Sequence, residues 1–238
     1  NMGNLHPDDW KSFKNLHPTE WEDINMLKQL EKIDRAGHKE FINGKRQYED
    51  NDYNIRDINV PTKEIMEEWN NVKDMAVSHR DGDTLLDFTN KGWSSLTLYG
   101  VSASVTTQSD EKHDWTEIKD KCKITKQWFE DTFHKENFRG RIRFMLLQPG
   151  GHILPHKDRQ SAGLNEVNIA INNPDKCSFH MENRGTLPFK EGSVMMLDLS
   201  NRHWVVNDSD QPRLHMIYHG NVPDNIIEKS YENLYYPN

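Results

Sequence analysis

From Arg141 onward, apolar residues recur at every second position, and this period constrains the fold more than any other feature of the chain. Seven segments alternate in this way: RIRFMLLQ, HILPHKD, EVNIAIN, CSFHMEN, SVMMLDL, HWVVND and RLHMIYHG. Turn-forming sequences part them, among them PGG, NNPDK, KEGS and DSDQP. A period of two is that of a strand, and short strands at such spacing are typical of a β-sandwich or a barrel-like jelly roll.

Helical patterns dominate the chain before these strands. Residues 62–79 (TKEIMEEWNNVKDMAVSH) predict a helix, with Thr62 as the N-cap and Glu64 in the first turn, where the helix dipole favours an acid. Residues 115–133 predict a second helix. Between them, residues 92–105 (GWSSLTLYGVSASV) alternate and carry β-formers, which predicts a strand. The expected fold class is mainly β with N-terminal helices.

Residues 1–60 are polar and contain a short repeat. NLHPDDW at 4–10 recurs as NLHPTEW at 15–21, and each copy places His-Pro before an acidic turn, as at a helix start. Two copies are too few for a solenoid, so two short helical turns are the simpler interpretation. Residues 24–33 have apolar positions at helical spacing. We expect a helical extension over 1–60, packed on a core of 61–238 within one compact domain.

Composition argues against several classes of protein. The chain has 238 residues and no run of 18 apolar residues that would predict a membrane span. Its formal net charge of -8 argues against a nucleic-acid partner bound by bulk electrostatics. Cys122 and Cys177 form no CxxC pattern, which argues against a disulfide framework or a thiolate zinc site. Since the N-terminus lacks a signal-peptide pattern, a cytoplasmic location is the simplest expectation.

Polar residues on or beside the predicted strands predict a metal site. His156 and Asp158 are two positions apart, so their side chains point the same way on an extended segment. His203 follows the SVMMLDL strand. Two imidazoles and one carboxylate are the ligands of non-haem Fe(II) oxygenases, which keep positions open for a cosubstrate and O₂. Arg213, in the last strand, has the planar fork that holds a carboxylate in bidentate fashion.

The spacing alone leaves other interpretations open. An HxD pair occurs by chance in many chains, as an exposed histidine beside charged residues. A zinc hydrolase also uses two histidines and an aspartate, although it would leave Arg213 unexplained. His215 and His219 share the face of Arg213, so they are candidates either for the pocket or for hydrogen-bonded core positions.

The segments that carry these residues resemble a known family. RFMLLQPGGHILPHKD, NEVNIAIN and FKEGSVMMLDLSNRHWVVNDSDQPRLHMIYHGNVPD are similar to the aspartyl/asparaginyl β-hydroxylases, Fe(II)/2-oxoglutarate dioxygenases that include free-proline hydroxylases. The resemblance covers about residues 141–224 and implies a double-stranded β-helix, or cupin-like, core. It implies that His156 and His203 ligate iron and that Arg213 binds the C5 carboxylate of 2-oxoglutarate. Asp158, where animal members have glycine, brings the chain closer to the proline-hydroxylase pattern.

Four further positions bear on the cosubstrate and the substrate. Asn168 stands where family members often have a histidine near the C1 carboxylate of 2-oxoglutarate. Glu166 replaces an arginine of acid-specific members, and a glutamate there would favour a neutral or amine-bearing substrate. In the alternative, Glu166 faces solvent and Arg159 supplies the missing positive charge. Trp93 lies in a segment that is a candidate for capping the barrel mouth and lining the substrate pocket.

These observations lead to an expected function. The protein is expected to be an Fe(II)- and 2-oxoglutarate-dependent dioxygenase that hydroxylates an amino-acid side chain with O₂ and releases succinate and CO₂. Its substrate is a free amino acid or a residue of a peptide or protein, with no nucleic-acid or membrane partner. The rival interpretation is a cupin-like protein that binds a metal or a small acid without turnover.

Overall fold

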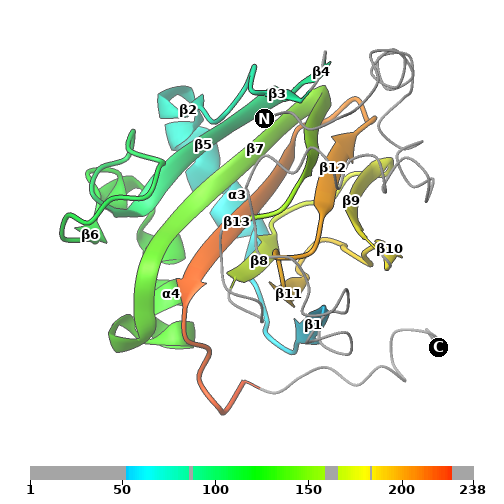
Figure 1. Cartoon of the computed structure of the whole chain (residues 1–238). Helices are drawn as coiled ribbons and strands as arrows, with labels where there is room; N and C mark the ends of the chain where they lie inside the picture. Colours follow the sequence, from blue (N-terminus) through cyan, green and yellow to red (C-terminus); the bar gives the residue numbers. More distant parts are fainter. Residues whose placement is uncertain (1–51, 86–87, 159–165, 183, 227–238) are drawn as a thin grey trace, which may run out of the picture.

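The period-two segments form one curled antiparallel sheet, which is the expected double-stranded β-helix (Figure 1). The computed structural model describes residues 52–85, 88–158, 166–182 and 184–226. The strands are β1 (Tyr53–Arg56), β2 (Val77–Ser78), β3 (Thr84–Leu85), β4 (Phe88–Thr89), β5 (Lys91–Gly100), β6 (Asp114–Trp115), β7 (Phe138–His156), β8 (Glu166–Ala170), β9 (Cys177–Met181), β10 (Gly185–Thr186), β11 (Val194–Leu197), β12 (His203–Asn207) and β13 (Arg213–Gly220). In the described ranges the sheet has the order β1-β11-β8-β13-β7-β12-β9-β10, and β5 pairs with β2, β6 and β7. β3 and β4 pair separately.

The 19-residue strand β7 is shared by both parts of the curl. Its first half pairs with β13 and β5, and its second half pairs with β12, where His156 lies opposite His203. Between the halves, Gly150 has a φ of 71°, and a Cβ on Gly151 would lie 2.7 Å from the carbonyl oxygen of Lys91. Glycine alone tolerates such a conformation and such an approach at no cost. The two glycines therefore permit β7 to change partners along its length.

Two helices cover the outer face of the sheet behind β5, β7 and β13 (Figure 1). They are α3 (Thr62–Val72) and α4 (Lys123–Phe133), with short 3-10 helices η3 (Lys73–Met75), η4 (Lys119–Lys121) and η5 (Lys135–Asn137). The ring of Trp69 lies 5.1 Å from that of Phe144, and the ring of Phe133 lies 4.1 Å from that of Tyr218. Burial of each such side chain is worth about 1.5–3 kcal/mol, so this outer core anchors the helices. None of the described helices combines the length and apolar character needed to cross a membrane.

The first helix is shorter than predicted. It begins at Thr62, but the N-cap position belongs to Pro61 and makes no side-chain hydrogen bond, so the prediction of Thr62 as N-cap is wrong. Glu64 does lie in the first turn. The helix ends at Val72 instead of continuing to residue 79, because the chain enters η3 and then β2, which pairs with β5.

The second helix begins later than predicted. The helical pattern over 115–133 is interrupted because Trp115 belongs to β6 and pairs with Tyr99 of β5. α4 starts only at Lys123. Strand pairing with a distant segment therefore overrides the local helical pattern.

A side chain of α3 caps the N-terminus of α4. The Glu68 carboxylate accepts hydrogen bonds from the backbone N–H groups of Ile124 (2.9 Å) and Thr125 (2.7 Å). It also accepts one from the Thr125 hydroxyl at 2.7 Å. The first N–H groups of a helix have no intrahelical partner, so Glu68 both satisfies them and joins the two helices.

The predicted strands are present, with differences at their ends. RIRFMLLQ and HILPHKD form the single strand β7, and the other five segments form β8, β9, β11, β12 and β13. The strand predicted over 92–105 is β5, which ends at Gly100 because Ala103 turns back to accept a backbone hydrogen bond from Thr97. Within the predicted helical extension, β1 forms an edge strand on β11, and residues 1–51 lie outside the described residues.

Candidate metal and cosubstrate site

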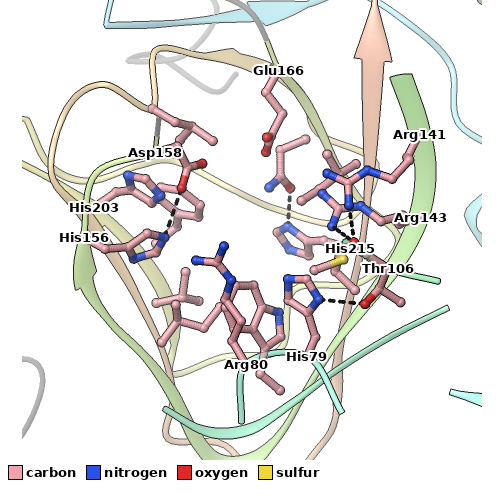
Figure 2. A pocket seen from close by; sticks show the side chains of 18 of the residues that line it. His79, Arg80, Thr106, Arg141, Arg143, His156, Asp158, Glu166, His203 and His215 are labelled. Atoms are coloured by element: carbon pink, nitrogen blue, oxygen red, sulfur yellow. Dashed lines mark hydrogen bonds and ion pairs between the residues drawn. The ribbon is translucent and has the colours of Figure 1, made fainter. Parts of the chain in front are cut away.

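A pocket of about 720 Å³ opens on the inner face of the curled sheet (Figure 2). Alternate residues of three strands line it, since side chains on a strand point to opposite faces in turn. The residues that β7, β8 and β13 contribute in this way are Arg141, Arg143, Met145, Glu166, Asn168, Arg213, His215, Ile217 and His219. The residues between them, such as Phe144 and Leu214, belong to the outer core. The pocket therefore follows from the period of the strands.

His156, Asp158 and His203 come together at one side of this pocket (Figure 2). One ligand atom of each lies within 4.8 Å of the others. His156 Nε2 is 3.4 Å from Asp158 Oδ1, and the two imidazole rings are 4.3 Å apart. In the described ranges no second group of three such side chains occurs. The structure thus brings together the three residues that the sequence predicted as a metal site.

The backbone orients both imidazoles. His156 Nδ1 donates a hydrogen bond to the carbonyl oxygen of Leu154 at 2.7 Å, and His203 Nδ1 donates to that of Asn201 at 2.8 Å. A ring nitrogen that carries a proton cannot bind a metal, so Nε2 of each histidine is the atom left for an ion. Two imidazole nitrogens and one carboxylate, held this way, form a donor set that fits Fe(II).

Electrostatics favour the protonation states that a metal requires. Burial of Asp158 favours its neutral form, but the hydrogen bond with His156 and the charges that His203 and His156 carry in acid outweigh this and hold its pKa below the usual range. Burial lowers the pKa of His203 to about 4. The carboxylate is therefore charged and the His203 imidazole neutral near pH 7, as metal ligation needs.

Arg213 is a buried cation in the same pocket. It is 4% exposed, and burial lowers its pKa to about 10. Its Nη2 donates a hydrogen bond to His215 Nδ1 at 3.0 Å, whereas its Nε has no hydrogen-bond partner in the described part of the chain. No carboxylate among the described residues forms an ion pair with it. A buried cation without such a partner is costly, so this position favours an anionic ligand.

Asn168 and His215 form a polar network beside Arg213. Asn168 Oδ1 lies 2.6 Å from His215 Nδ1, the nitrogen that Arg213 Nη2 also approaches, and His215 Nε2 lies 3.1 Å from Asn173 Oδ1. Burial, together with the charge of Arg213, lowers the pKa of His215 well below its ordinary value, so the ring is neutral. His215 is thus both a pocket residue and a hydrogen-bonded buried one. The contact of Asn168 with a C1 carboxylate stays a prediction.

Two of the three predicted substrate residues line the pocket. Glu166 is 4% exposed, and its Oε2 lies 3.7 Å from His219 Nε2, so it does not face solvent. Trp93 packs edge-on against the ring of His79, with centroids 4.5 Å apart. Arg159 lies outside the described residues. Whether Glu166 and Trp93 contact a substrate stays a prediction.

Three pocket arginines were not predicted from the sequence: Arg80, Arg141 and Arg143 (Figure 2). Arg141 and Arg143 alternate with apolar residues in RIRFM, and such charges on one face of a strand were a usable signal. Arg80 follows β2 in a turn, where no periodic pattern marks it.

A profile of the aspartyl/asparaginyl beta-hydroxylase family matches residues 57–223. The chain belongs to this family. The match includes both helices, the strands that carry His156, His203 and Arg213, and Asp158 just after the end of β7. As an aspartyl/asparaginyl β-hydroxylase family member, the protein is an enzyme of a hydroxylase family with the expected mainly β, cupin-like fold.

Several solved structures are similar to this family member at low identity. A prolyl hydroxylase from Trichoplax adhaerens, in complex with a hypoxia inducible factor fragment, is 11% identical with a TM-score of 0.47, over 73% of this chain and 86% of that one. A prolyl-4-hydroxylase from Pseudomonas putida is 12% identical with a TM-score of 0.44, over 74% and 96%. A 2OG-Fe(II) oxygenase family oxidoreductase from Burkholderia pseudomallei is 16% identical with a TM-score of 0.39, over 54% and 68%. No curated protein matches the chain.

Proposed function

We propose that this protein is an Fe(II)- and 2-oxoglutarate-dependent dioxygenase that hydroxylates an amino-acid side chain. His156, Asp158 and His203 hold Fe(II), and Arg213 holds the distal carboxylate of 2-oxoglutarate. The observation that carries the proposal is a buried arginine, without a carboxylate partner among the described residues, in the same pocket as a His-Asp-His group. A zinc hydrolase would use such a metal group but not this arginine. Family membership supports the hydroxylase class.

The residues of the chain bind and orient the metal, the cosubstrate and the substrate, and they exclude water from the site. When bound, Fe(II) and 2-oxoglutarate together with O₂ supply the chemistry that oxidises a C–H bond and yields succinate and CO₂. Arg213 holds one end of the dicarboxylate through its planar guanidinium, and Asn168 donates a hydrogen bond toward the other end. The ring of Phe179 stacks on that of His203 at 5.7 Å and shields this ligand from water.

Glu166 bears on which side chain reacts. It is buried in the pocket near His219, and charges interact more strongly at buried positions than in water. A carboxylate there disfavours an acidic reacting side chain and favours a neutral or amine-bearing one. Aspartate side chains are therefore poor substrates, and proline-like or amine-bearing side chains are good ones.

The experiment incubates the protein aerobically with Fe(II), 2-oxoglutarate and a panel of free amino acids and of Asp-, Asn- and Pro-containing peptides. Succinate from 2-oxoglutarate and a mass gain of one oxygen on a panel member are the expected products. Binding of both metal and 2-oxoglutarate without any succinate would instead support a cupin-like binding protein. Efficient hydroxylation of an aspartate side chain, undiminished in Glu166→Gln, would defeat the substrate assignment.

A further inference from the structure

Two guanidinium groups face the His-Asp-His group across the pocket, and a third extends toward the pocket centre. Figure 2 shows His156, Asp158 and His203 on the left, Arg141 and Arg143 on the right, and Arg80 extending into the pocket from below. We call Arg80, Arg141 and Arg143 the guanidinium wall. None of them has a role in holding the metal or the cosubstrate in the proposed function.

One carbonyl oxygen holds two of these cations together. Arg141 Nη1 and Arg143 Nη1 both donate hydrogen bonds to the carbonyl oxygen of Thr106, the second at 3.0 Å. Arg143 Nη2 also lies 3.3 Å from His219 Nε2. A neutral carbonyl cannot balance two positive charges. Burial, and after it the charge of Arg141, lowers the pKa of Arg143 to about 10, although the charges of Glu166 and Asp158 act in the opposite direction. An anion placed against the wall would relieve this repulsion.

Arg143 also keeps an unused donor. Its side chain is buried, with 6% of the residue exposed, and its Nε has no hydrogen-bond partner in the described part of the chain. Buried donors are normally satisfied, and an unsatisfied one costs the full desolvation of the group. A ligand oxygen in the pocket is the partner that such a donor calls for.

Arg80 reaches the pocket from a strained turn. Its φ is 51°, in the left-handed region that non-glycine residues seldom occupy. Its carbonyl oxygen accepts hydrogen bonds from Asp83 N at 3.1 Å and from Asn90 Nδ2 at 3.0 Å, which hold this conformation. The side chain extends toward the pocket centre (Figure 2). Strain of this kind persists where function requires it, and here it directs a cation inward.

Positive charge exceeds negative charge in the described lining of the pocket. The ionisable residues there, histidines aside, are Arg80, Arg141, Arg143, Lys157, Arg213, Asp83, Asp158 and Glu166. Under the proposed function, Fe(II) takes Asp158 and 2-oxoglutarate takes Arg213. The three arginines of the guanidinium wall then outnumber the two remaining carboxylates, Asp83 and Glu166, so the unfilled part of the pocket suits an anionic group.

We propose that the guanidinium wall is the subsite for the α-carboxylate of a free amino acid, which turns the amino acid's side chain toward the His-Asp-His group. This inference rests on the proposed function and decides between the free and polypeptide substrates that the function leaves open. A residue inside a polypeptide presents a neutral amide instead of an α-carboxylate, and an amide brings no charge to three guanidinium groups. Glu166, in the same pocket, favours the α-ammonium group of the same substrate.

The test measures binding rather than turnover. Each of the common L-amino acids, its α-carboxamide and its doubly blocked N-acetyl amide is titrated under argon, and thermal stabilisation of the full chain is recorded with and without Fe(II) and 2-oxoglutarate. At least one free amino acid is expected to bind. Its α-carboxamide should bind at least about tenfold more weakly, a difference typical of one charge-assisted contact, and its doubly blocked form should not bind.

Matched variants assign the effect to the wall. Arg143→Gln and Arg80→Gln should each weaken binding of that amino acid at least about tenfold, while the affinity for 2-oxoglutarate stays within about twofold. Arg80 is exposed on a turn, so its variant keeps the test valid if Arg143→Gln fails to fold. Arg139→Gln is the control, because Arg139 is exposed on the same strand and donates only to nearby carbonyl oxygens. It should bind as the unmodified chain does.

Several results would overturn the inference. In the ligand series they are equal binding of a free amino acid and its carboxamide, binding of blocked forms alone, or no binding by any free amino acid. In the variant series they are undiminished amino-acid binding in both Arg143→Gln and Arg80→Gln, or loss of 2-oxoglutarate affinity in these variants. Failure of the proposed function is separate, since it appears as an absence of succinate from 2-oxoglutarate. In that case the assignment of Arg143 and Arg80 to an α-carboxylate subsite would remain valid.

Discussion

Arg213 and His215 lie two residues apart on one face of β13, and Arg213 Nη2 donates a hydrogen bond to His215 Nδ1 at 3.0 Å. The imidazole is fully buried and neutral, and its Nε2 contacts Asn173 Oδ1 at 3.1 Å. A neutral ring that carries its proton on Nε2 can accept from the guanidinium through Nδ1, whereas a doubly protonated ring would repel it. His215 therefore orients the residue that is proposed to hold 2-oxoglutarate.

Replacing His215 tests this orienting role. In His215→Phe the guanidinium loses its acceptor, so the KM for 2-oxoglutarate should rise about 10-fold while Fe(II) affinity stays unchanged. Because a general loss of packing would not separate these two constants, their ratio is the informative quantity. His215→Asn, which keeps an acceptor, should recover part of the loss; equal KM values in all three proteins would rule out the role.

Removing the charge at position 213 should have a larger effect. If Arg213 holds 2-oxoglutarate as proposed, Arg213→Leu leaves the distal carboxylate of this cosubstrate without its charged partner, at a cost of about 2–5 kcal/mol. Steady-state kinetics should show a much higher KM for 2-oxoglutarate, with Fe(II) affinity little changed. Arg213→Lys keeps the charge but not the bidentate fork, so its KM for 2-oxoglutarate should lie between those of the unmodified chain and Arg213→Leu. An unchanged KM in Arg213→Leu would refute the assignment.

The metal site predicts a loss of binding that does not depend on turnover. His156→Ala or His203→Ala removes one of three donors, and calorimetric titration with Fe(II) under argon should show no measurable binding. His113→Ala is a suitable control, since His113 lies beside Tyr99, away from the pocket residues. A double histidine variant that still binds Fe(II) and hydroxylates fully would contradict the site.

Buried histidines predict that stability declines in acid. Burial, reinforced by the charge of Arg143, lowers the pKa of both His79 and His219 to about 3. Their unfolded pKa is near 6.5, so below that pH the unfolded chain binds protons that the folded chain does not. Stability is therefore complete above pH 6.5 and falls below it, by about 1.4 kcal/mol per pH unit for each such histidine. Urea unfolding at pH 7.5 and 5.5 measures the decline.

His79→Gln identifies one of these groups. This variant keeps a polar side chain beside Thr106, to which His79 Nδ1 lies within 3.2 Å, but it cannot be protonated. As the pH is lowered, the free energy of unfolding of this variant should fall less steeply than that of the unmodified chain. The difference is the contribution of one histidine. Equal slopes in the two proteins would show that His79 does not titrate in this way.

The link between the helices predicts a stability effect far from the pocket. Glu68→Ala removes the acceptor for Ile124 N and Thr125 N at the start of α4. Loss of a cap typically costs about 0.5–2 kcal/mol, so the urea midpoint should fall without a change in Fe(II) affinity. Glu67→Ala, at an exposed neighbouring position, is the matched control and should leave the midpoint unchanged.

The clustering of the His-Asp-His group was predictable because its members lie on or directly beside strands. His156, Asp158 and His203 follow from the alternation and from the residue types that Fe(II) accepts, and Arg213 follows from its place in the last strand. Local pattern carries this information, because the period of a strand determines which side chains share a face.

What the sequence did not indicate depends on contacts between distant segments. The alternation in RIRFM places Arg141 and Arg143 on one face of the strand, but which face points inward depends on how the sheet curls. Arg80 depends on a turn whose conformation comes from its hydrogen bonds to Asp83 and Asn90. Trp115 has a helical pattern around it but pairs with Tyr99, because a tertiary partner outweighs local propensity.

The edge strand β1 has a consequence for the order in which the chain assembles. It pairs with β11, and Asp52 beside it accepts a hydrogen bond from Asn201, 149 residues further along. The ribosome synthesises β1 long before β11. Among the described strands, β1 is therefore made first but cannot pair until β11, one of the last, has been made. Contacts so distant in sequence form slowly. A chain that lacks residues 1–56 would leave the outer backbone groups of β11 open to pairing with another molecule. Self-association should accompany that truncation.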